Sequence, residues 1–117
     1  MQKMKTLILV LIAAAAGCAS YPAPTEKMVS AEAAIRGAQE VGAAKVPQAQ
    51  LHVTLAQEQV DKAKKLMADG DNQRAESLLV RAQADAELAL SEAKEENAKR
   101  EAQRSVDEVK ALKEKLK

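Results

Sequence analysis

The sequence contains no tryptophan or phenylalanine, and Tyr21 is its single aromatic residue. Without large rings the chain cannot fill a thick core, so its helices must approach closely through small aliphatic side chains. A single cysteine excludes a disulfide within one chain. The only histidine, His52, leaves too few of the usual ligands for a zinc site. We therefore expect no catalytic, cofactor-binding or metal-binding residues.

Neither sign of charge dominates the sequence, since 18 lysines and arginines face 17 acidic residues for a net charge of +1. The two signs alternate along the chain, which excludes the basic surface that nucleic-acid binding requires. Charged residues make up 30% of the 117 positions, and together with alanine, leucine and glutamine they are typical of long helices. No glycine-rich phosphate loop and no Ser-His-Asp set can be assembled, so we expect no enzyme.

The chain also lacks an apolar run long enough to cross a membrane. Its longest run, Leu7–Ala16, is about half of the roughly 20 residues that a spanning helix needs. Lys3 and Lys5 precede this run and small residues follow it. This order is typical of a removable signal peptide, which we assign to residues 1–17.

The signal ends in Ala15-Ala16-Gly17-Cys18, which resembles the lipobox of bacterial lipoproteins. The resemblance implies cleavage between Gly17 and Cys18, followed by a diacylglyceryl thioether on the sulfur and an acyl chain on the new amino group. Several acyl chains form a practically permanent membrane anchor. Ala19, which stands where an aspartate would favour the inner membrane, implies an outer-membrane protein that faces the periplasm. An ordinary secretory signal followed by a chance cysteine is the alternative.

Residues 18–24 are predicted to form a lipidated tether, because Pro22 and Pro24 prevent a regular helix. Tyr21 is expected to be a passive part of this tether. Apolar residues at three- and four-residue spacing then predict an α-helical bundle domain over residues 25–93.

Two of the predicted helices come before residue 70. The first begins at Thr25 or Ser30, both of which are good N-caps. The second runs from Pro47 or Gln48 to about Asp69, because proline is acceptable in a first helical turn. His52 lies off the main apolar stripe of this second helix, and we expect its side chain to face solvent.

Gly70-Asp71 is the predicted interhelix turn. Glycine can adopt the left-handed conformation that ends one helix, and Asp71 can cap the next. A connection this short places the flanking helices antiparallel. The predicted fold is therefore all-α, an antiparallel three-helix hairpin or bundle.

The third helix is predicted to be about 45 residues long, because neither proline nor glycine follows Gly70. Residues 94–117 form a charged helical extension beyond the bundle, resembling one strand of a coiled coil. The extension carries its own apolar stripe, offset from that of the bundle: Ala102, Ser105, Val109, Leu112 and Leu116. Such a helix either pairs with another copy or a partner protein, or stays solvated.

Residues 30–93 resemble small alanine-rich helical domains of unknown function in Gram-negative lipoproteins, often found beside peptidoglycan-binding domains of the outer-membrane-protein-A type. The resemblance rests on short alanine-containing segments and on the turn: Ala33-Ala34-Ile35-Arg36, Ala38, Glu40, Gly42-Ala43, Pro47, Leu51, Ala56, Ala63, Gly70-Asp71, Ala75, Ala82 and Asp85-Ala86-Glu87-Leu88-Ala89. Asn72 departs from it, because we expect an aromatic residue there. The chain is also loosely similar to the murein lipoprotein, whose terminal lysine is joined to peptidoglycan, which implies Lys117 as a possible link.

The function expected from these patterns is that of a lipid-anchored periplasmic structural or scaffolding lipoprotein of the cell envelope, without catalysis. Two alternatives are a helical protein-binding module for an envelope complex and a cell-wall tether through Lys117. The expected partners are the membrane through the lipid, an envelope protein or peptidoglycan, and a second copy of the chain. No nucleic acid and no cofactor are expected.

Overall fold

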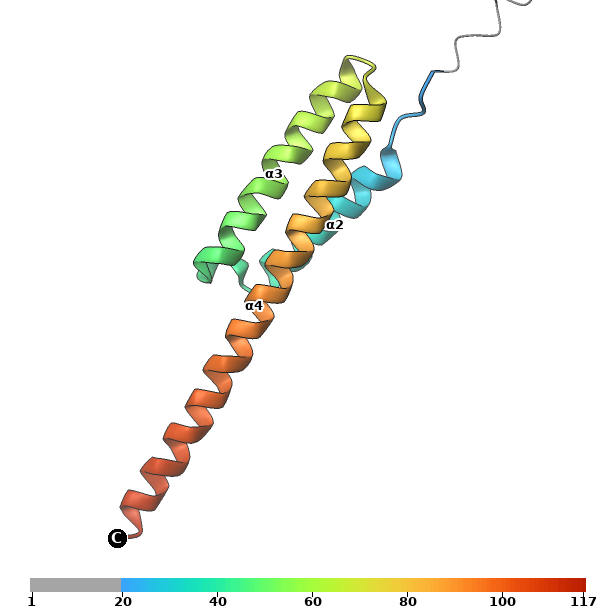
Figure 1. Cartoon of the computed structure of the whole chain (residues 1–117). Helices are drawn as coiled ribbons and strands as arrows, with labels where there is room; N and C mark the ends of the chain where they lie inside the picture. Colours follow the sequence, from blue (N-terminus) through green and yellow to red (C-terminus); the bar gives the residue numbers. More distant parts are fainter. Residues whose placement is uncertain (1–19) are drawn as a thin grey trace, which may run out of the picture.

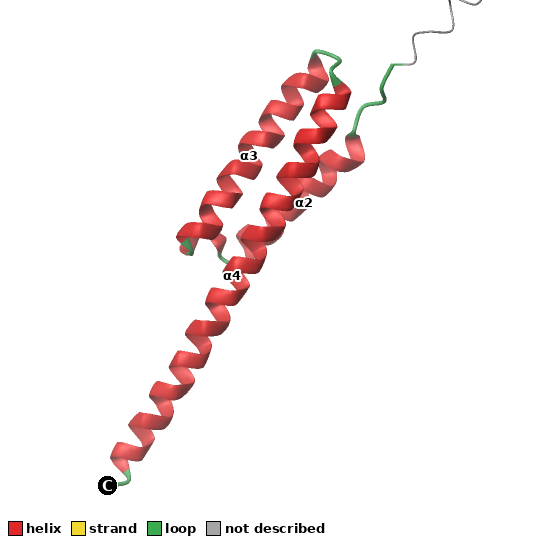
Figure 2. Cartoon of the chain, in the orientation of Figure 1, coloured by secondary structure: helices red, strands yellow, loops and turns green. Residues whose placement is uncertain are grey.

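The computed structural model describes residues 20–117, and within this range the chain is helical and contains no strand (Figure 2). The predicted all-α class is therefore confirmed for this part of the chain. The described helices are three α-helices and one short 3-10 helix: α2 (Thr25–Glu40), η2 (Ala43–Lys45), α3 (Pro47–Ala68) and α4 (Asn72–Lys115). The predicted signal peptide, its cleavage before Cys18 and the lipid on Cys18 lie outside the described residues.

Helix α2 begins at Thr25, the earlier of the two predicted starts. The backbone carbonyl of Pro24 accepts a hydrogen bond from the N–H of Met28 at 3.0 Å and so closes the first turn. The helix ends at Glu40, and Gly42 then takes a left-handed conformation with φ +88°. A residue with a side chain is strained at this angle, so glycine permits the sharp change of direction into η2.

Helix α3 begins at Pro47, in the first turn, where the missing proline N–H has no helical partner to lose. At its other end Gly70 has φ +80°. The N–H of Gly70 donates to the carbonyl of Met67 at 3.1 Å, and the N–H of Asp71 donates to that of Leu66 at 2.8 Å. These paired bonds are a Schellman motif, which satisfies carbonyls that the end of a helix leaves free.

The three helices contact one another through small side chains. Two apolar clusters join α2, α3 and α4, and alanine supplies most of their buried positions. Leu79 of α4 and Val60 of α3 are the largest side chains that are completely buried. The first cluster is made of Ala31, Ile35, Ala56, Val60, Ala63, Ala75, Leu79, Ala82 and Ala86. The second is made of Ala38, Ala43, Val46, Ala49, Ala89 and Ala93.

Helix α4 continues far beyond these clusters and makes the molecule elongated (Figure 1). Its 44 residues agree with the predicted length of about 45. At 1.5 Å per residue the helix is about 66 Å long. Among the described residues none after Ala93 is buried. Near this point the side-chain amide of Asn97 donates to the carbonyl of Val41 at 2.9 Å, which fastens α4 to the end of α2.

Pairs of side chains one helical turn apart support the solvated part of α4. The Nζ atom of Lys99 lies 2.6 Å from Oε1 of Glu95, and the Nε atom of Arg100 lies 3.0 Å from Oε1 of Glu96. Such pairs each contribute only a few tenths of a kcal/mol, but they add to the high helix propensity of this sequence. None of the helices in the described part of the chain combines the length and the apolar composition that crossing a membrane requires.

Replacing Leu79 with alanine tests whether the narrow core carries the stability. Leu79 is completely buried, so Leu79→Ala should lower the free energy of unfolding by about 3 kcal/mol through lost burial and the cavity left behind. Leu88 lies on the same helix but is 45% exposed, so Leu88→Ala should cost less than about 1 kcal/mol. Urea denaturation followed by circular dichroism measures both changes. Equal losses would contradict this account of the core.

Candidate functional site

The predicted site residues are spread over the length of the molecule. Gly70 and Asp71 connect α3 to α4, and Asp71 accepts a hydrogen bond at 3.3 Å from the backbone N–H of Arg74, capping α4. Lys117 lies exposed just beyond the far end of α4. Gly17 and Cys18 lie outside the described residues. Among the residues that the structure describes, the predicted turn and Lys117 therefore lie at opposite ends of α4 and do not form one site.

The tether, by contrast, is not the passive segment that we expected. The hydroxyl of Tyr21 donates a hydrogen bond to the Oε2 carboxylate oxygen of Glu76. The side-chain amide of Asn72 donates to the backbone carbonyl of Tyr21 at 2.8 Å. Both partners lie in the first turns of α4, so the chain at Tyr21 is docked at the α3–α4 turn. The residue that departs from the expected pattern, Asn72, is one of the two that hold the tether.

The docking contact raises the pKa of Tyr21. The pKa of its hydroxyl is raised from the ordinary value, chiefly because the Glu76 carboxylate accepts its hydrogen bond, and also through desolvation and the nearby negative charge. A raised pKa means that the contact favours the protonated phenol. At pH values below the ordinary tyrosine pKa, the contact therefore stabilises the docked tether in full. This stabilisation is lost as the pH rises through the raised pKa of Tyr21.

A second polar cluster lies between α3 and α4. The Nδ1 atom of His52 lies 3.4 Å from Oδ1 of Asp85, and its Nε2 atom lies 3.8 Å from Oε1 of Glu92. The side-chain amide of Gln59 donates to Oδ2 of Asp85 at 2.8 Å. The His52 side chain is only 17% exposed, so the expectation that it faces solvent is wrong. His52 faces α4 because a row of polar side chains beside the buried alanines also lies in the interface between α3 and α4. We call this row the polar seam.

The geometry of this cluster favours a structural role. The two carboxylates address opposite nitrogens of the ring, so they cannot share one metal ion with it. Within residues 20–117 no three histidine, cysteine or acidic side chains are placed to hold a metal. Both distances are longer than direct hydrogen bonds. A signal for this seam exists in the sequence, because His52 and Gln59, like Asp85 and Glu92, are two turns apart.

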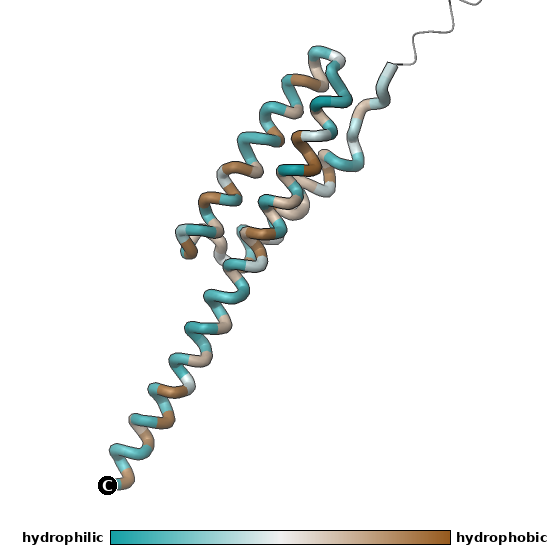
Figure 3. Tube along the Cα trace, in the orientation of Figure 1, coloured by the Kyte–Doolittle hydropathy of each residue, from teal (hydrophilic) through white to brown (hydrophobic). Residues whose placement is uncertain are grey.

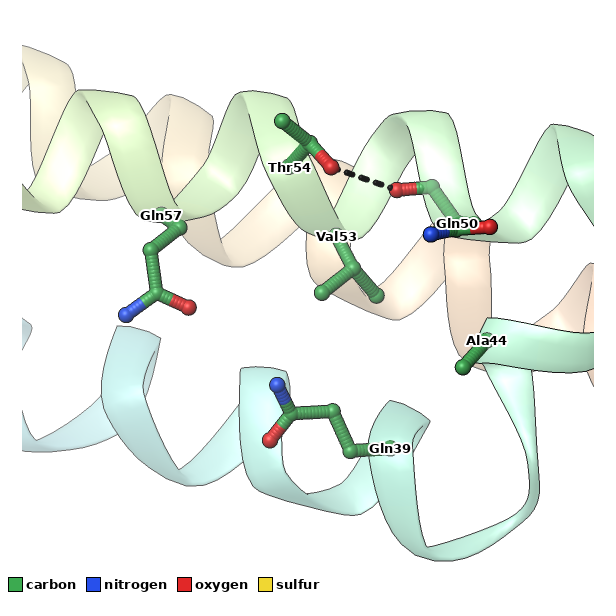
Figure 4. A pocket seen from close by; sticks show the side chains of 6 residues that line it. All are labelled: Gln39, Ala44, Gln50, Val53, Thr54 and Gln57. Carbon is green, nitrogen blue, oxygen red and sulfur yellow. Dashed lines mark hydrogen bonds between the residues drawn. The ribbon is translucent and has the colours of Figure 1, made fainter.

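The surface between α2 and α3 carries an open groove of about 300 Å³, and three of its six lining residues are glutamines (Figure 4). The side chain of Gln39 on α2 extends toward α3, where Val53 and Gln57 lie opposite. The hydroxyl of Thr54 is already used, since it donates to the backbone carbonyl of Gln50 at 3.0 Å. Neutral amides can bind polar groups, but they supply neither a nucleophile nor a general base.

Replacing Glu76 with alanine tests the docking of the tether. The protein has one tyrosine, so the ultraviolet absorbance of phenolate during a pH titration reports on Tyr21 alone. Glu76→Ala should lower the pKa of Tyr21 back toward its ordinary value, because the carboxylate that accepts the hydroxyl hydrogen bond is gone. Glu87→Ala removes an exposed carboxylate elsewhere on α4 and should leave the titration unchanged. Equal midpoints in the wild type and Glu76→Ala would contradict the docking.

A double-mutant cycle tests the polar seam. Replacing His52 and Asp85 with alanine, singly and together, should give a coupling energy of about 0.5–1 kcal/mol, because the pair is partly sheltered from solvent. The matched cycle combines His52→Ala with Glu87→Ala, and it should show no coupling, since Glu87 is exposed. Urea denaturation supplies the four free energies. A coupling of zero in the first cycle would mean that the two side chains are merely adjacent.

Comparison with known proteins gives one match. The profile of a domain of unknown function, DUF4398, matches residues 26–105, which run from the first turn of α2 to beyond the point where α4 leaves the bundle. Neither the curated proteins nor the solved structures compared with the chain give a match. The match bears out the predicted resemblance to a domain of unknown function, while the lipoprotein part of that resemblance stays a prediction. Because the matched residues make up more than half of the sequence, the chain belongs to the DUF4398 family.

Proposed function

We propose that this protein is a lipid-anchored structural lipoprotein of the Gram-negative cell envelope and that it has no catalytic activity. In this proposal residues 1–17 are removed as a signal peptide and Cys18 carries the lipid. The protein sits at the outer membrane and faces the periplasm, where its helices act as a scaffold. The signal ending in Gly17-Cys18 supports the anchor, and the elongated helical part supports the scaffold.

The observation that carries this proposal is the short apolar run ending in Ala15-Ala16-Gly17-Cys18. The docking of Tyr21 on the first turns of α4 then sets how a lipid on Cys18 would orient the helices. Tyr21 is only three residues from Cys18, so at most about 11 Å of extended chain separates them. With Tyr21 held by Asn72 and Glu76, a lipid on Cys18 would bring the α3–α4 turn close to the membrane surface. Helix α4 starts at this same end, so its far end would stand about 66 Å away.

The finer arrangement of the helices belongs to this proposal. Residues 25–93 would form an antiparallel three-helix bundle that acts as the base of the scaffold. The two apolar clusters shared by the helices support it, as do the short connections around Gly42 and Gly70. Residues 94–117 would then be the part that projects toward the cell wall or an envelope complex. A domain held at one end, with a helix projecting from it, suits a protein that sets the distance between the membrane and a partner better than one that catalyses a reaction.

A covalent bond between Lys117 and peptidoglycan gains no specific support from the geometry. Lys117 is exposed at the far end, but so are Lys110, Lys113 and Lys115. The geometry therefore does not distinguish Lys117 from these three lysines.

Labelling cells that express the full chain with a fatty-acid analogue tests the anchor. The wild type and the neighbouring control Ser20→Ala should incorporate the label, while Cys18→Ala should lose it, because no other residue of the sequence has a thiol. Separation of the inner and outer membranes should place the labelled protein with the outer membrane. Equal label in Cys18→Ala, or a native mass that retains residues 1–17, would overturn the proposal.

A further inference from the structure

The charged extension carries large apolar side chains that nothing in the described chain covers. Val109 is 51% exposed, Leu112 is 60% exposed and Leu116 is 88% exposed. A shallow apolar groove runs along one flank of these residues and is lined by Ser105, Val106, Val109, Lys110 and Lys113. Figure 3 shows apolar residues recurring along α4 well past the end of the bundle. We call the spaced set Ala102, Ser105, Val109, Leu112 and Leu116 the tail stripe.

The tail stripe faces away from the bundle. The buried stripe of α4 ends at Ala93, and the next positions on the same face are Glu96 and Arg100, which pair with each other at 3.0 Å. Ala102 follows Arg100 by two residues, which is a rotation of about 200° around an α-helix. The five positions of the tail stripe lie about 100–180° around the helix from Ala93, with their centre at about 140°. The tail stripe therefore points away from the buried face. Another helix could lie along it without meeting α2 or α3.

We propose that the tail stripe is the interface with a second copy of this chain, and that the two extensions pair in parallel and in register as a short two-stranded coiled coil. The stripe has the alternating four- and three-residue spacing of heptad positions a and d. In this register Val109 occupies an a position and Leu112 a d position. A β-branched residue at a with leucine at d favours two parallel strands.

The flanking charges support the parallel orientation. In a parallel pair, Glu108 at position g lies beside Lys113 at position e of the second copy, and symmetry provides this attraction twice. In an antiparallel pair two attractions between Glu101 and Lys115 remain, but Lys99 would then lie beside Lys113 twice and the two Glu108 side chains would face each other. The antiparallel arrangement therefore has three like-charge contacts, against the two between Lys94 and Lys99 that the parallel register has at the start of the extension.

The charges also limit how far the paired region can extend along α4 toward residues 25–93. Continued upstream in parallel, the same register places Lys94 beside Lys99 of the second copy and Glu87 beside Glu92, so like charges oppose each other. The contact is therefore confined to about the last 20 residues, which makes it weak between freely diffusing chains and stronger where copies are held close together. The interface is inferred from the sequence of the extension alone, and the lipid anchor proposed above would strengthen it by holding copies close together.

Cysteine cross-linking of the full chain in the cells that express it tests this interface. Leu112→Cys places thiols next to each other in the parallel pair, so mild oxidation should give a disulfide-linked dimer. Ala111→Cys is the matched control, because Ala111 lies on the opposite side of α4, is equally accessible and should give at least fivefold less dimer. The wild type reports any dimer formed through Cys18. Two differently tagged copies establish that both halves of the product are this chain.

Exchanging the charges that flank the tail stripe tests the same interface, with Leu112→Cys kept as the single introduced cysteine. In the Leu112→Cys background, Glu108→Lys should reduce the dimer, because lysine then faces Lys113 of the second copy. Adding Lys113→Glu should restore it. Equal dimer from Ala111→Cys and Leu112→Cys, or no dimer from Leu112→Cys, would overturn the proposal. A larger yield of disulfide-linked dimer from Ala102→Cys on one copy and Leu112→Cys on the other, compared with Leu112→Cys on both copies, would overturn the parallel orientation.

Discussion

Close approach of helices through alanine is the constraint on which this structure depends. A methyl side chain buries little area, so each contact contributes little, and stability requires many of them in regular order. That order holds only while the buried stripes of α2, α3 and α4 stay in phase, which leaves little tolerance for kinks. Within residues 20–117 the largest completely buried side chains are those of Leu79 and Val60. The helices are therefore held by narrow rows of small side chains and not by a thick core of large ones.

The regular parts of this arrangement could be predicted from the sequence because periodicity is their cause. Alanines at three- and four-residue spacing predict helices, and the absence of glycine and proline after Gly70 predicts that the last helix continues. Asp71 and Gly70 have side-chain and backbone properties that suit the ends of helices, and such properties act locally. Nothing beyond neighbouring residues is needed to predict them.

The contacts that define the candidate sites could not be predicted in this way. Tyr21 reaches Glu76, which is 55 positions later in the sequence, and no local pattern connects the two. The position of His52 off the apolar stripe predicts a solvent-facing side chain, yet a partly polar seam also belongs to the interface with α4. The site that matters most for the proposed function, Cys18, rests on its sequence context alone, because it lies before the described residues.

The unbroken course of α4 has a mechanical consequence. The helix contains neither glycine nor proline between Asn72 and Lys115, so it has no built-in hinge where the bundle ends. The bundle occupies about half of its length, so a tilt about the α3–α4 turn displaces the tip about twice as far as it displaces the last buried residue. The extension thus transmits a tilt of the clustered helices to its free end and has no glycine or proline at which to absorb it.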